Sequence, residues 1–80
     1  MTISELKAAL VRERVMESAY SFAGGLPNER FCIASCPSGW EVYYSERGYK
    51  SGLRVFQDES SACDYFLAQI LADHTTRDAR

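Results

Sequence analysis

The sequence has no large excess of charge of either sign, because nine basic and eleven acidic side chains give a net charge of -2. That balance provides no general attraction to nucleic acid or to an anionic membrane. No apolar run approaches the roughly 20 residues that a membrane-spanning helix requires. The N-terminal residues also lack the basic and apolar regions of a secretory signal, so we expect a cytoplasmic protein without membrane contact.

Thiol and imidazole side chains are few: three cysteines, Cys32, Cys36 and Cys63, and one histidine, His74. An odd number of cysteines without a signal peptide is typical of free thiols in a reducing compartment. Cys32 and Cys36 do not have the C-x-x-C spacing of zinc and thioredoxin sites. Cys63 falls on an apolar helical stripe about three turns before His74, where a small core residue is expected. We therefore predict no metal, no cofactor and no enzymatic activity.

The apolar content of the chain, 46% with ten aromatic side chains, is sufficient for a folded domain. Residues 2–14 should form a helix, because Thr2 and Glu5 match a capping box and apolar residues recur at helical spacing. A second helix is expected over residues 58–73, where Asp58 is a suitable N-cap. Its apolar stripe should pack on one face of a sheet and consists of Ala62, Cys63, Phe66, Leu67, Ile70 and Leu71.

Three strand-like runs lie between these helices, at residues 30–35, 40–45 and 49–56, with turn signals between them. Residues 20–22 form either a short fourth strand at the sheet edge or part of a loop. The sequence thus predicts a single α+β domain over residues 1–80. Its order is N-terminal helix, antiparallel meander sheet and C-terminal helix packed on one sheet face.

Alternation of apolar and polar residues predicts the register of both hairpins. We expect Ile33 opposite Val42 in the first hairpin, and Tyr44 opposite Tyr49 in the second. A slip by one residue would scatter the apolar residues over both faces. The predicted core face of the sheet comprises Phe31, Ile33, Trp40, Val42, Tyr44, Tyr49, Leu53 and Val55.

The opposite face is flat, and its single tyrosine, Tyr43, is expected across from Lys50 with no role in the core. A tyrosine among small and charged residues is either the centre of a protein interface or a shield for strand backbone. Glu46 and Arg47 occupy a turn tip, where contact with a partner and simple solvation are both reasonable. The predicted partner-binding residues are Glu29, Glu41, Tyr43, Glu46, Arg47, Lys50, Arg54 and Glu59.

The predicted order of elements also occurs in double-stranded-RNA-binding domains, which contact phosphates through basic residues at the start of their second helix. Here the second helix begins with Asp58-Glu59-Ser60-Ser61, which is acidic and polar. We therefore do not expect nucleic-acid binding. A generic adaptor or a self-associating module that uses the strand edge or the Tyr43 face is the stronger alternative.

Two runs, YSFAGGLPNE at residues 20–29 and WEVYYSERG at residues 40–48, resemble a pattern in small bacterial immunity proteins. The resemblance covers roughly residues 20–72 and points to partners of NAD-degrading toxins of the tuberculosis-necrotizing-toxin type, delivered by type VI or related secretion systems. It implies a non-enzymatic inhibitor that binds its cognate toxin tightly and occludes the active site. Arginines that bind NAD phosphates in such a toxin could then meet the glutamates named above.

Overall fold

The computed structural model describes residues 1–76, apart from the side chain of His74; residues 77–80 of the predicted domain lie outside this description. The main elements are α1 (Ile3–Arg12), β1 (Tyr20–Ser21), β2 (Arg30–Cys36), β3 (Gly39–Glu46), β4 (Tyr49–Phe56) and α2 (Glu59–Ala72). Short 3-10 helices, η1 (Glu17–Ala19) and η2 (His74–Thr76), precede β1 and follow α2. The α+β prediction is confirmed: a helix at each end of the order and a mostly antiparallel four-stranded sheet between them.

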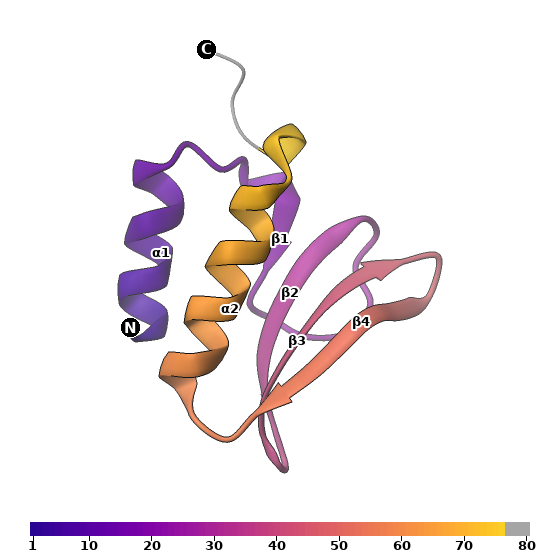
Figure 1. The fold of residues 1–80 in the computed structure, drawn as a ribbon. Coiled ribbons are helices and arrows are strands. Elements are labelled where there is room, and N and C mark those ends of the chain that lie inside the picture. The colour runs from indigo at the N-terminus through magenta and orange to yellow at the C-terminus, as the bar shows by residue number, and fades with distance from the viewer. Residues whose placement is uncertain (77–80) are drawn as a thin grey trace.

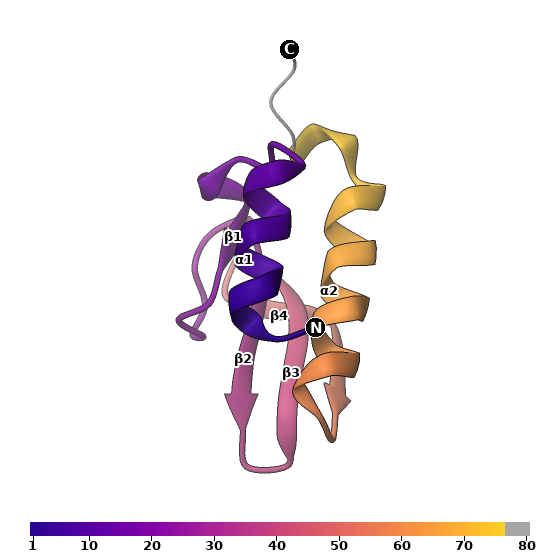
Figure 2. The same ribbon diagram turned by 90° about the vertical axis from the view of Figure 1, so that its left-hand side faces the viewer.

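The two long helices lie side by side on one face of the sheet (Figures 1 and 2), and α2 contacts β2, β3 and β4. The predicted apolar stripe of α2 is confirmed, because four of its residues are buried and the other two pack against the core. From α1, Leu6 and Leu10 join the same core, and from the sheet Ile33 and Val42 do so. Burial of this kind supplies most of the free energy that favours folding.

Helix α1 begins as predicted but ends earlier, at Arg12. Thr2 and Glu5 form the expected capping box, in which the Glu5 N–H donates to Thr2 Oγ1 at 3.2 Å and the Thr2 N–H donates to Glu5 Oε1 at 2.8 Å. At the other end Arg14 has a φ of 62°, and the Val15 N–H donates to the Leu10 carbonyl at 2.9 Å. This is a Schellman turn, in which glycine usually occupies the position of Arg14. The sequence therefore carried no glycine signal for the helix end.

The first predicted hairpin register is confirmed, since Ile33 lies opposite Val42 between β2 and β3. The sheet order is β1-β2-β3-β4, so β1 is indeed an edge strand. It differs from the expected antiparallel meander, because Tyr20 pairs with Phe31 in a parallel arrangement. The connection over residues 22–29 returns the chain so that β1 and β2 run in the same direction.

The predicted register of the second hairpin is wrong, because Tyr49 lies opposite Glu46 and not opposite Tyr44. Only Arg47 and Gly48 remain in the turn, with φ values of 51° and 80°. Positive φ at both central residues is typical of the type I′ turn, whose twist matches that of the strands it joins. The predicted pairing of Tyr44 with Tyr49 implied a longer turn, so the expected partners along β4 were displaced.

The pairing of β3 with β4 also contains a bulge, which shifts the register by one residue. Tyr44 lies opposite Ser51 but Val42 lies opposite Arg54, so Tyr43 faces two residues, Gly52 and Leu53. Gly52 has a φ of 64°, as expected for the glycine of a G1 bulge. From this point β4 turns Arg54 toward the helix side of the sheet.

Three residues assigned to the core face are therefore exposed. Leu53 and Val55 lie on the face away from the helices, and 47% and 51% of their surfaces remain accessible. Tyr49, beside the turn, is 66% exposed. Phe56, which was not assigned to the core face, lies opposite Trp40 and packs against the core.

Candidate protein-interaction surface

Tyr43 was expected to be exposed, and the structure shows that it is buried, with 2% of its surface accessible. The segment over residues 22–29 runs along the side of the sheet that faces away from the helices (Figure 1). The Tyr43 hydroxyl donates a hydrogen bond of 2.7 Å to the Gly25 carbonyl in this segment. Lys50 covers the ring, with Nζ 4.7 Å from the ring centroid. The predicted position of Lys50 across from Tyr43 is wrong, because Lys50 lies opposite Ser45, although its ammonium group still reaches the Tyr43 ring.

The environment of Tyr43 keeps two titratable groups neutral. Burial raises the pKa of Tyr43 to about 12, and the nearby Cys32 and Glu41 add to the effect. Burial also raises the pKa of the Cys32 thiol, which lies in the same layer. Desolvation penalises the charged form of each group. These residues therefore form a second, small core beneath the 22–29 segment and are not available to a partner.

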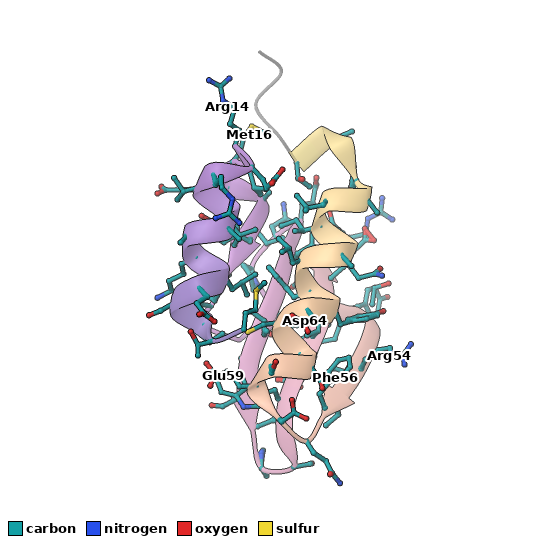
Figure 3. The ribbon with its side chains drawn as sticks, turned by 60° about the vertical axis from the view of Figure 1, so that its left-hand side comes forward. Arg14, Met16, Arg54, Phe56, Glu59 and Asp64 are labelled. Carbon is teal, nitrogen blue, oxygen red and sulfur yellow. The ribbon has the colours of Figure 1, made fainter. Side chains whose placement is uncertain are left out.

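Two of the predicted glutamates stabilise the domain itself. Glu41 binds Lys50 through both carboxylate oxygens, at 3.1 and 3.3 Å from Nζ. Glu59 accepts a hydrogen bond of 2.7 Å from the backbone N–H of Ile3, which joins the starts of α1 and α2. Figure 3 places Glu59 at the first turn of α2, on the side of α1 and away from Arg54.

The other two glutamates, Glu29 and Glu46, lie near Tyr44 at one end of the sheet. Glu29 and Tyr44 line a cleft of about 450 Å³ that also includes Asp73. Burial raises the pKa of Tyr44, and the charges of Glu29, Glu46 and Asp73 raise it further. Arg30 also lines the cleft, but its Nη1 donates to the Glu17 and Tyr20 carbonyls at 3.1 and 3.2 Å. The cleft is therefore lined by two carboxylates and one guanidinium, whose charge the two neutral carbonyls do not cancel.

The three predicted basic residues, Arg47, Lys50 and Arg54, gather along β4 and its turn. Strand β4 pairs with β3 on one side and is an edge on the other. All of its residues except Phe56 are exposed. Figure 3 shows Arg54 extending outward from β4, and its guanidinium carbon lies 5.1 Å from the centroid of the Tyr65 ring.

We use the name β4 edge for the exposed charged and large apolar side chains of this strand and its turn: Arg47, Tyr49, Lys50, Leu53, Arg54 and Val55. Half of this set was predicted to bind a partner, and the other half was assigned to the core. The signals that could have identified the apolar half are Gly48, which indicates a two-residue turn, and Gly52, which indicates a bulge.

No protein-family model, curated protein or solved structure matches this chain. Among the residues that the structure describes, no group of three or more His, Cys, Asp or Glu side chains is placed to hold a metal ion. No helix within residues 1–76 combines the length and the apolar character needed to cross a membrane. The relationship to immunity proteins remains a prediction from the sequence pattern.

Proposed function

We propose that this domain is an immunity protein that binds and neutralises a secreted antibacterial toxin, and that it does so through the β4 edge. One observation carries the proposal: an eight-residue strand exposes Tyr49, Leu53 and Val55 along an unpaired side of the sheet. Proteins usually shorten or cover such edges, because they pair readily with other chains. An edge that stays long and partly apolar is suited to a protein partner.

The contacts behind β4 support a rigid binding surface. The Glu41–Lys50 ion pair joins β4 to β3, and Lys50 also packs on the buried Tyr43 ring. Tyr43 in turn is fixed to the 22–29 segment by its bond to Gly25. A surface that is already ordered loses little conformational entropy when it binds, which favours the high affinity that an inhibitor needs.

The sequence pattern suggests that the toxin degrades NAD and that the inhibitor occludes its active site. Within this proposal Glu29 and Glu46 are the glutamates suited to meet toxin arginines, because Glu41 and Glu59 already have partners inside the domain. Glu46 is the last residue of β3, directly before the turn that carries Arg47. Contacts at this turn would lie beside the β4 edge, so both could belong to one interface.

The test is co-purification of this chain with the product of the neighbouring gene, followed by measurement of NAD consumption. Wild-type protein should form a tight one-to-one complex that stops NAD loss. Val55→Lys should weaken the complex at least about tenfold, because it places a charge in the apolar part of the edge. Val11→Lys is the matched control, since Val11 is also exposed, at 73%, but lies on α1.

The possible results separate the parts of the proposal. Tight binding without an effect on NAD would retain immunity and reject the NAD-degrading class of toxin. Equal affinities of the two lysine variants would reject the β4 edge as the binding surface. Failure of the wild-type chain to bind would reject the immunity function.

A further inference from the structure

We infer that β4 binds an extended segment of its partner as an additional strand of the sheet, and that this segment alternates acidic with apolar side chains. The inference deepens the proposed function and its biological meaning rests on that function.

The backbone of β4 offers hydrogen bonds to a new strand. Tyr49 and Glu46 close a two-residue turn and therefore form a hydrogen-bonded pair. In an antiparallel ladder the next pair, Lys50 and Ser45, is not hydrogen-bonded, so Lys50 directs its N–H and C=O away from β3. A strand added at this edge would satisfy these groups and the others that face outward.

The charge along the strand defines the partner's chemistry. Residues 49–56 include Lys50 and Arg54 and no acidic residue, and Arg47 lies in the adjoining turn. Glu41 neutralises Lys50. Within residues 1–76 Arg54 has a ring contact with Tyr65 but no carboxylate partner. The positive charge of Arg54 and Arg47 therefore favours an acidic partner segment.

The two faces of β4 require different side chains from the added strand. Arg54 lies on the helix side, opposite Val42, whereas Val55 lies on the other side, opposite Glu41. Leu53 shares that other side and is exposed. Successive residues of a strand point to opposite faces. An alternating segment would thus place carboxylates beside Arg54 and apolar side chains beside Leu53 and Val55.

A second copy of this chain fits the edge poorly. Pairing two β4 strands would bring Lys50 and Arg54 of both copies onto one shared edge, with no acidic residue in β4 of either copy. Cations on an edge strand oppose such self-pairing. The occupant that the charges favour is a different, acidic chain.

The experiment titrates capped synthetic peptides into the full chain and follows the backbone amide signals by NMR. The probe alternates valine and glutamate, and the matched control peptide alternates valine and lysine. We expect saturable shifts of the β4 amides with the acidic peptide, and binding of the basic peptide at least about tenfold weaker. Arg54→Gln should weaken binding of the acidic peptide about threefold, whereas Arg12→Gln, the same change on α1, should leave it unchanged.

Three results would overturn the inference: no shift at millimolar acidic peptide, shifts confined to other elements, or equal binding of the two peptides. Shifts of β4 amides that grow with protein concentration in the absence of peptide would also overturn it, by showing that a second copy occupies the edge. Because the titration uses no toxin, its outcome is independent of the co-purification. Peptide binding without toxin binding would retain strand addition and reject immunity, and the reverse result would reject only strand addition.

Discussion

Strands β2 and β4 both pair antiparallel with β3, yet the side chains of β2 are mostly buried or half-buried and those of β4 are mostly exposed. In β2 the neighbours Cys32 and Ile33 point to opposite faces and are both buried. In β4 every residue before Phe56 is exposed. The helices cover one face of β2, and the 22–29 segment lies along the other side of the sheet. Because both strands pair with β3, the segments that cover β2, and not strand pairing, account for the burial of its side chains.

The exposed state of β4 has a consequence for function. Helix α2 touches β4 at Phe56 and Arg54, but the rest of the strand is exposed. Most of β4 therefore contributes little to the free energy of folding through burial, so its side chains can be selected for binding. The central strand β3 supports it from one side, while its own Val42 and Tyr43 are buried in different layers. The molecule thus combines a stable part, where β2 and β3 are covered, with an accessible part along β4.

The largest effect that separates the two strands should come from truncating one apolar residue in each. Ile33→Ala in β2 should lower the free energy of unfolding by about 3 to 4 kcal/mol, because Ile33 is 1% exposed and its removal leaves a cavity. Leu53→Ala in β4 should change it by less than about 0.5 kcal/mol. Urea denaturation of both variants measures the difference. Similar losses would show that Leu53 is part of the core after all.

The sequence was informative wherever local chemistry determined the structure. The Thr2–Glu5 capping box and the Asp58 cap predicted where the helices begin, and the Asp58 side chain accepts the Ser61 N–H at 2.7 Å. Alternation over Phe31 to Tyr44 predicted the first hairpin, since Ile33 and Val42 share the helix side of the sheet and are buried in the main core. Periodicity alone thus gave the fold class and most element bounds.

The errors arose where tertiary structure decided the outcome. Alternation in β4 suggested a core strand, but Gly52 introduces a bulge that alternation cannot reveal. Tyr43 looked like an interface residue because the 22–29 segment has no periodic pattern that would predict its position over the sheet. The candidate site was therefore only half predicted: its basic residues were identified, and its apolar residues were placed in the core.

Replacing the glycines of the two hairpins should have effects on stability of intermediate size. At Gly39, which begins β3, φ is 136° and an added Cβ would collide with the Phe56 carbonyl oxygen. At Gly48, in the turn before β4, φ is 80° but nothing lies within 4 Å of an added Cβ. Gly39→Ala should therefore cost about 2 to 3 kcal/mol and Gly48→Ala about 1 kcal/mol. Thermal and urea unfolding would measure both, and an equal cost would mean that the backbone at Gly39 can shift freely.

The smallest expected change in stability distinguishes the buried Tyr43 of β3 from the exposed Tyr49 of β4. It is tested first with Tyr43→Phe. Loss of the hydroxyl removes the bond to the Gly25 carbonyl, and we expect about 1 kcal/mol less stability at neutral pH. Tyr49→Phe is the matched control on exposed β4, with an effect within about 0.5 kcal/mol. A loss at Tyr43 no larger than that at Tyr49 would mean that the 22–29 segment is not held by this bond.

The pH dependence of the same variant provides an independent check on the burial of Tyr43. Its pKa is raised from 10.0 to about 12 in the folded protein, so the folded state retains the proton over this interval while the unfolded chain releases it. Stability that depends on neutral Tyr43 is thus complete below pH 10 and is lost as pH rises toward 12. Wild type should lose stability with pH more steeply than Tyr43→Phe, although Tyr20 and Tyr44, whose pKa values are also raised, contribute to both slopes. Denaturation at pH 9 and pH 11 measures the slopes. Parallel slopes would show that Tyr43 ionises in the folded state as readily as in the unfolded chain. A tyrosine sealed between the sheet and the 22–29 segment cannot do so.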